Sequence, residues 1–208
     1  MERTFVDDEY TTPPTGATLA EIAKLTVYDS QGKMLDFKGL IRDQKTIVVF
    51  IRHFFCGSCQ QQYVIQFAQV KPESLQQAGV RIVVIGCGEW QPIQNYRETT
   101  GFKGEVYADP SRSLYKALGL VENVQTTPAG KNKRSYLTKG LLSNTLQSIW
   151  QGPLKNPLHI GKQGDIHQNG GDFVFGPGET CSFASRMRHT EDHVEVADLL
   201  RAAGVELE

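Results

Sequence analysis

The chain has 208 residues, of which 39% are hydrophobic and 22% are charged, and its formal net charge is -1 at pH 7. This composition is typical of a soluble globular protein, and the length favours one domain. The small net charge provides no long-range field for nucleic acid or for an anionic membrane. We recognise neither a signal peptide nor a run of about 18 apolar residues that would span a bilayer. We therefore expect a cytoplasmic protein.

The first third of the chain predicts short strands followed by a buried one. Residues 1–16 are polar and contain two consecutive prolines, so we expect an irregular lead-in before a single domain over residues 17–208. Two short strands around a turn are predicted at residues 25–28 and 34–37. Residues 46–51 are continuously apolar and rich in β-branched side chains, which is typical of a central strand covered on both faces.

The rest of the chain alternates helices with strands. Apolar residues at helical spacing predict a helix over residues 60–77, and a second buried strand follows at residues 80–85, which implies a right-handed parallel crossover. The further predicted elements are a helix at 91–100, a strand at 105–108, a helix opened by Asp109 and Pro110, an insertion near 121–150, a hairpin at 172–184 and a helix at 194–203. This order predicts an α/β, thioredoxin-like fold with a central mixed sheet sandwiched by helices.

Two of the four cysteines, Cys56 and Cys59, stand between the buried strand and the helix that follows it. Unpaired N–H groups at the first turn of a helix stabilise a thiolate, so a Cys-x-x-Cys pair in this place predicts a redox-active disulfide. We assign Cys56 as the attacking thiol and Cys59 as the resolving thiol. Gly57 and Ser58 between them are small and would leave the outer sulfur accessible.

Other interpretations of the cysteines stay open at this point. A zinc site needs two further ligands, and His189 and His193, four residues apart, are candidates. Inert core cysteines are a third interpretation. Cys87 ends the strand next to the one that leads into Cys56, so its sulfur is expected near the pair, although packing is the simpler explanation for a buried cysteine. We expect neither a bound metal nor a bound cofactor.

Two residues just before the pair are candidates for the same site. Arg52 can stabilise a thiolate or a developing peroxide anion by charge and hydrogen bonding. His53 is a candidate for substrate binding, and Phe55 for the wall of the cleft. Solvent exposure at the strand end is the alternative for either Arg52 or His53.

The segment from Phe50 to Cys59, FIRHFFCGSC, resembles the redox motif of the AhpC/TSA antioxidant-enzyme domain proteins, the peroxiredoxin-like branch that includes prostamide/prostaglandin F synthase. Further matching stretches are residues 83–86, 106–110, 115–119, 143–150 and 168–177. The resemblance implies a thioredoxin fold. The sequence differs from those of true peroxiredoxins, because the proline and threonine expected upstream of the peroxidatic cysteine are missing. It also differs from thioredoxins, because Gly170 and Gly171 stand where those proteins have a cis-proline, so these glycines are predicted to open the substrate cleft.

The resemblance implies a thiol-dependent oxidoreductase that reduces a peroxide or an organic (endo)peroxide. The Cys56–Cys59 disulfide would then be reduced by an external thiol, either thioredoxin or glutathione. Two alternatives stay open: a biosynthetic enzyme for one specialised organic substrate, and a non-catalytic redox sensor or interaction domain. The sequence identifies neither the substrate nor the reductant, and it leaves open whether the chain forms a homodimer.

Overall fold

The computed structural model describes residues 8–56, 58–125, 127, 134–138 and 157–206, with the side chains of 8, 58–61 and 138 left aside. Its helices are α1 (Asp8–Thr11), α2 (Gly16–Ile22), α3 (Phe37–Ile41), α4 (Ser58–Ala68), α5 (Pro72–Gln77), α6 (Ile93–Thr100), α7 (Ser113–Ala117), α8 (Ser135–Thr138), the short 3-10 helix η1 (Pro157–His159) and α10 (Val196–Ala202). Its strands are β1 (Thr26–Tyr28), β2 (Met34–Asp36), β3 (Lys45–Phe50), β4 (Val80–Gly86), β5 (Glu105–Ala108), β6 (Gly171–Phe175) and β7 (Cys181–Arg186).

Within the described residues, seven strands form one mixed sheet in the order β2-β1-β5-β4-β3-β6-β7. The two neighbours of β4 run parallel to it, whereas β6 pairs antiparallel with β3 and β7 with β6. The strands predicted from the continuous apolar runs are therefore the central ones, as burial on both faces requires. The fold prediction is confirmed.

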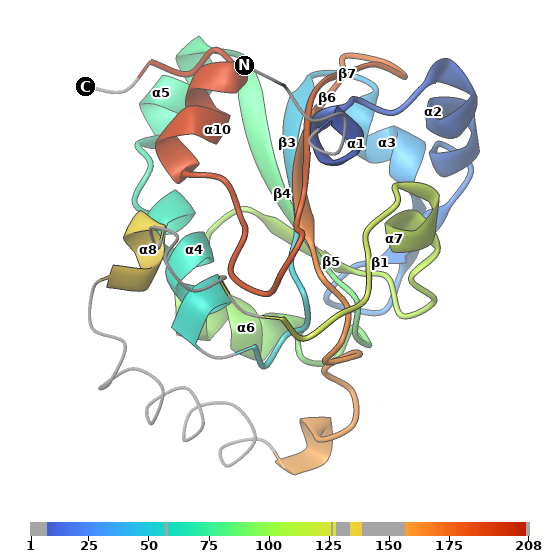
Figure 1. Ribbon diagram of the computed structural model, residues 1–208, viewed down its shortest axis with the longest axis vertical. Coiled ribbons are helices and arrows are strands. Elements are labelled where there is room, and N and C mark those ends of the chain that lie inside the picture. The colour runs from blue at the N-terminus through green and yellow to red at the C-terminus, as the bar shows by residue number, and fades with distance from the viewer. Residues whose placement is uncertain (1–7, 57, 126, 128–133, 139–156, 207–208) are drawn as a thin grey trace, which may run out of the picture.

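Helices cover both faces of the sheet (Figure 1). On one face, Ile47, Val49 and Val174 pack in a core with side chains of α4, α6, α8 and α10. On the other face, Val48 and Phe50 pack with side chains of α2, α3 and α7. The alternation along β3 follows from the two-residue period of a strand, and every residue of β3 after Lys45 is buried.

Prolines and caps move several helix boundaries from their predicted places. The helix expected over residues 60–77 is two helices, because α4 ends at Ala68 and Pro72 starts α5; proline removes a backbone donor and biases the preceding residue away from helical geometry. The next predicted helix, at 91–100, begins only after Pro92. The α7 helix begins at Ser113, and the Asp109 carboxylate caps it by accepting from the N–H of Leu114 at 2.9 Å.

The described part of the predicted lead-in, from residue 8 on, is partly helical. Helix α1 lies within it, and Arg186 of β7 donates to the carbonyl oxygens of Glu9 and Thr12 at 3.1 and 2.8 Å. Most of the predicted insertion at 121–150 lies outside the described residues. Among the residues that the structure does describe, no helix combines the length and the hydrophobicity that crossing a membrane requires.

Candidate functional site

Cys56 and Arg52 lie together just beyond the carboxyl end of β3. The guanidinium of Arg52 donates from Nη1 to the Cys56 Sγ at 3.2 Å, and the backbone N–H of Cys56 donates to the His53 carbonyl. Cys56 is only 9% exposed. Beneath this turn the Tyr115 hydroxyl lies 2.6 Å from the Ile51 carbonyl and 2.8 Å from the Ile85 carbonyl, which ties the ends of β3 and β4 together. The structure thus brings the predicted attacking thiol and its predicted cation into contact.

Arg52 also holds a distant part of the chain, segment 162–168, over these strand ends. Its Nε donates to the Gln168 carbonyl at 3.3 Å, and its Nη2 donates to the Ile166 carbonyl. Backbone N–H groups of Glu89 and Phe54 bind the carbonyls of Lys162 and Gln163 at 2.8 and 3.0 Å. One guanidinium therefore connects the thiol to segment 162–168.

A salt bridge outside the predicted site fixes the same segment. Arg112 donates from Nη1 to Asp165 at 2.9 Å and to Glu122 at 2.7 Å. The sequence analysis missed Arg112 and Asp165, because neither lies near the cysteines in the sequence and no local motif connects them. Only the positive φ of 57° at Arg112 marks it as unusual, and that is a property of the folded backbone.

Close packing against segment 162–168 explains the role of Cys87. A Cβ on Gly164, where φ is +102°, would lie 2.6 Å from the Cys87 Sγ, so glycine is required there. The Cys87 thiol donates to the Arg52 carbonyl at 2.7 Å, and burial raises its pKa to about 12. Cys87 therefore stays protonated at neutral pH and supports the backbone of Arg52.

His53 and Phe55 lie next to this contact. His53 is 8% exposed, and its Nδ1 has no hydrogen-bond partner among the described residues. Burial, with repulsion from Arg52, lowers the pKa of His53 to about 4, so its imidazole is neutral at pH 7. Phe55 is partly buried against the core beneath α4 and α6. Their assignment to substrate binding stays a prediction.

Gly170, just before β6, and Gly171, its first residue, are both buried, and packing against the neighbouring strands explains both. A Cβ on Gly170 would lie 1.8 Å from the Phe50 carbonyl oxygen, and one on Gly171 would lie 2.8 Å from that of Ser185. The two backbones therefore approach neighbouring strands more closely than any other residue type allows. That these glycines also open a cleft stays a prediction.

The remaining predicted site residues fall outside what the structure describes. Gly57 and the side chains of Ser58 and Cys59 belong to that part, so a disulfide between Cys56 and Cys59 stays a prediction. Cys56, Cys87 and Cys181 are free thiols. Among the described residues, no three His, Cys, Asp or Glu side chains are grouped as a metal site would require, and the zinc candidate His193 instead contacts Asp172 at 3.0 Å.

The reactivity of Cys56 differs from the prediction based on its motif. A thiol at a helix start is expected to be acidified, but burial raises the pKa of Cys56 above its ordinary value, and the charge and hydrogen bond of Arg52 oppose this only in part. Cys56 lies two residues before α4 rather than in its first turn. At neutral pH it is therefore mostly a protonated thiol in this structure.

We expect the alkylation rate of Cys56 by iodoacetamide to rise about tenfold per pH unit from pH 6 to pH 8, because only the thiolate reacts and its fraction grows with pH. Peptide mass mapping at each pH measures this for Cys56 separately from Cys87 and Cys181. A rate that levels off below pH 7 would show an acidified thiol and contradict the burial argument.

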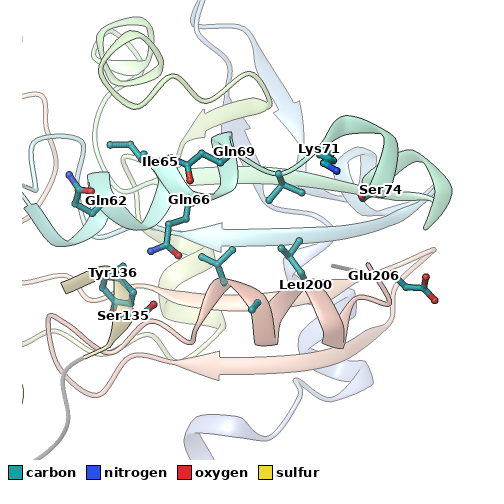
Figure 2. Close-up of a pocket in the computed structure, with 13 residues that line it drawn as sticks. Gln62, Ile65, Gln66, Gln69, Lys71, Ser74, Ser135, Tyr136, Leu200 and Glu206 are labelled. Atoms are coloured by element: carbon teal, nitrogen blue, oxygen red, sulfur yellow. The ribbon is translucent and has the colours of Figure 1, made fainter. Parts of the chain in front are cut away.

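A separate groove of about 550 Å³ lies between α4 and α10 and contains none of the predicted site residues (Figure 2). Gln62 and Gln66 of α4 and Gln69, just after its end, line one wall, and Leu200 of α10 lies on the opposite side. Its volume is in the range of ligand pockets. Because none of the predicted site residues lines this groove, we take the contact of Cys56 with Arg52 as the candidate site.

Comparisons with known proteins agree with the resemblance. A family model described as AhpC/TSA antioxidant enzyme matches residues 66–189. Peroxiredoxin-like 2C of Homo sapiens is 35% identical over 195 residues, which cover 93% of this chain and 84% of that protein. Prostamide/prostaglandin F synthase of Aquarana catesbeiana is 28% identical over 170 residues, which cover 75% of this chain and 83% of that protein. The crystal structure of Peroxidoxin BcpB from Mycobacterium tuberculosis matches with a TM-score of 0.56 and 12% identity, over 88% of this chain and 94% of that one, which supports the fold alone.

Proposed function

Because the chain belongs to the AhpC/TSA antioxidant-enzyme family, we propose that it is a thiol-dependent oxidoreductase that uses Cys56 to reduce a peroxide. The observation that supports this most directly is the Arg52–Cys56 contact of 3.2 Å in a nearly buried site. A guanidinium in that position stabilises both the thiolate and the negative charge that develops on peroxide oxygens. The neutral His53 beside it adds a polar group without adding charge.

The proposed reaction has two steps. The Cys56 thiolate attacks the O–H oxygen of a hydroperoxide, the O–O bond breaks, and the other oxygen leaves and takes up a proton, which gives a sulfenic acid and an alcohol or water. Cys59 then attacks the sulfenic sulfur, so that a disulfide forms and water leaves. An external thiol, thioredoxin or glutathione, reduces the disulfide by exchange and returns both thiols.

The alternative of an enzyme for one specialised organic substrate has support from exposed apolar side chains. Leu158, Ile160 and Ile166 are 83, 63 and 51% exposed. They stand on η1 and the chain that follows it, and the Ile166 carbonyl is bound by Arg52. Aliphatic groups at this end of the molecule favour an organic peroxide over hydrogen peroxide. A relative named Prostamide/prostaglandin F synthase is consistent with that substrate class.

The test is to treat the fully reduced protein with hydrogen peroxide, an organic hydroperoxide or a stable endoperoxide and to follow its intact mass. We expect a loss of two hydrogens in the wild type with each oxidant and no change in Cys56→Ser. In Cys59→Ser we expect a gain of one oxygen with hydrogen peroxide or the organic hydroperoxide, and a gain of the whole endoperoxide mass with the endoperoxide, because both of its oxygens stay on one molecule. Cys181→Ser is the control, because burial raises the pKa of that thiol to about 11 and it is expected to take no part.

If no peroxide oxidises the protein but oxidised glutathione does, the chain is a thiol–disulfide exchanger or a redox sensor. If an organic peroxide reacts much faster than hydrogen peroxide, the specialised enzyme is favoured over general antioxidant defence.

A further inference from the structure

The groove between α4 and α10 has two chemically different sides. On one side, Gln62 and Gln66 of α4 and Gln69 just after it present carboxamides. On the other side, Val196 and Leu200 of α10 are apolar. Gln66 points from α4 toward α10, and Leu200 points toward α4 (Figure 2). A ligand that fills the groove must therefore offer hydrogen-bonding groups to α4 and apolar groups to α10.

The fold does not use these glutamine amides. No hydrogen bond within the described part of the chain involves the carboxamide of Gln62, Gln66 or Gln69. On α6, by comparison, the Gln94 amide donates to Glu98 of the same helix at 2.8 Å. Each carboxamide has an acceptor and two donors in one plane, so it can pair with a peptide unit through both an N–H and a C=O. The groove thus offers a row of amides whose natural partner is another amide.

The spacing of this row fits an extended chain. Four residues of a helix advance about 6 Å, which separates Gln62 from Gln66 along α4. An extended chain repeats every two residues, about 6.8 Å, and each repeat turns one N–H and one C=O to the same edge. The two glutamines can therefore pair with alternate residues of an extended peptide, as a neighbouring strand would.

We propose that this groove binds an extended peptide segment of a partner protein, with the Gln62 and Gln66 amides paired to the peptide backbone. The side chains on one face of the peptide, which are those of every second residue, pack against Val196 and Leu200. A purely apolar ligand of the same volume would desolvate the amides and leave them without partners, which costs free energy. The groove is separate from the Arg52–Cys56 contact, so this binding does not depend on the proposed peroxide chemistry.

The test begins with selection of a phage-displayed library of random octapeptides on the immobilised full chain. We expect the enriched sequences to carry apolar residues at every second position. An enriched peptide is then synthesised with a fluorescein label, and its Kd is measured by fluorescence polarisation. Gln62→Leu combined with Gln66→Leu is expected to weaken binding about 100-fold, because two pairs of backbone groups lose their partners.

Two controls separate a specific effect from a change in the surface. Gln76→Leu combined with Gln77→Leu makes the same exchange on α5, where both side chains are exposed and neither lines the groove. This variant is expected to bind the peptide as the wild type does. On the peptide, N-methylation of every second amide is expected to abolish binding in one register and to be tolerated in the other, because only one edge faces α4.

Three results would overturn the proposal. One is a selection that enriches no peptide, and another is an enriched peptide that binds the Gln62→Leu, Gln66→Leu variant as tightly as the wild type. The third is enrichment of apolar residues spaced by three and four, which would indicate a helical ligand instead of an extended one. Cys56→Ser is expected to bind the peptide with unchanged Kd, so a failure of the proposed peroxide chemistry leaves this test intact.

Discussion

Arg52→Gln is expected to slow oxidation of Cys56 by a hydroperoxide about 100-fold at pH 7. The substitution removes the positive charge that holds the pKa of Cys56 below the value that burial alone would give. It also removes the Nη1 donor that lies 3.2 Å from the sulfur. Both losses act on the same step, since one lowers the thiolate fraction and the other removes stabilisation of the peroxide oxygens. Stopped-flow oxidation and the pH profile of alkylation separate the two, because alkylation responds only to the first.

The matched control for this experiment is Arg112→Gln. Arg112 holds segment 162–168 through its 2.9 Å contact with Asp165, as Arg52 does through Ile166 and Gln168, but no hydrogen bond connects Arg112 to Cys56. Loosening this segment alone is therefore expected to change the oxidation rate several-fold at most. Arg52→Lys keeps the positive charge but loses the planar guanidinium with its paired N–H donors. It is therefore expected to restore the effect on the pKa of Cys56 but not the stabilisation of the peroxide oxygens. Equal rate losses in Arg52→Gln and Arg112→Gln would mean that Arg52 acts through the segment and not on the sulfur.

The central strands could be predicted from the sequence because their signal is local and strong. The apolar runs at 46–51 and 80–85 are too hydrophobic to lie at a sheet edge, and in the structure they pair in parallel with Lys45 opposite Val80. Helix ends were harder to predict, because proline at 72 and the cap at Asp109 compete with the apolar spacing that defines a helix. Propensity locates an element more reliably than it locates its ends.

The site could be predicted only where its residues are close in sequence. Arg52 and Cys56 are four residues apart at a strand end, and the motif itself indicates both. Segment 162–168 is more than a hundred residues away, and its only marks in the sequence are glycines that any loop has. The pKa of Cys56 was predicted in the wrong direction, because the motif indicates the helix start but not the burial that outweighs it.

His193→Leu is expected to lower the free energy of unfolding by about 3–5 kcal/mol, because it leaves the Asp172 carboxylate buried without its partner. Asp172 is fully buried on β6, and the His193 Nδ1 lies 3.0 Å from both of its carboxylate oxygens. The same carboxylate accepts the backbone N–H of Val194 at 3.3 Å, so it fixes the chain that leads into α10. The His193 ring also stacks on Tyr63 of α4, with centroids 4.3 Å apart. The pair thus connects the sheet to two of the helices that cover it.

A double-mutant cycle separates the charge effect from lost packing. Asp172→Val combined with His193→Leu removes both polar groups, and it is expected to recover most of the loss, because a buried pair replaced by apolar groups is often neutral for stability. The exposed pair Arg201–Asp198, at 2.5 Å, is the control, and Arg201→Ala is expected to cost about 1 kcal/mol or less. Urea unfolding with an unchanged m-value measures all of these variants. A double variant as unstable as the sum of the two single ones would mean that the two side chains stabilise the fold independently, by shape rather than by pairing.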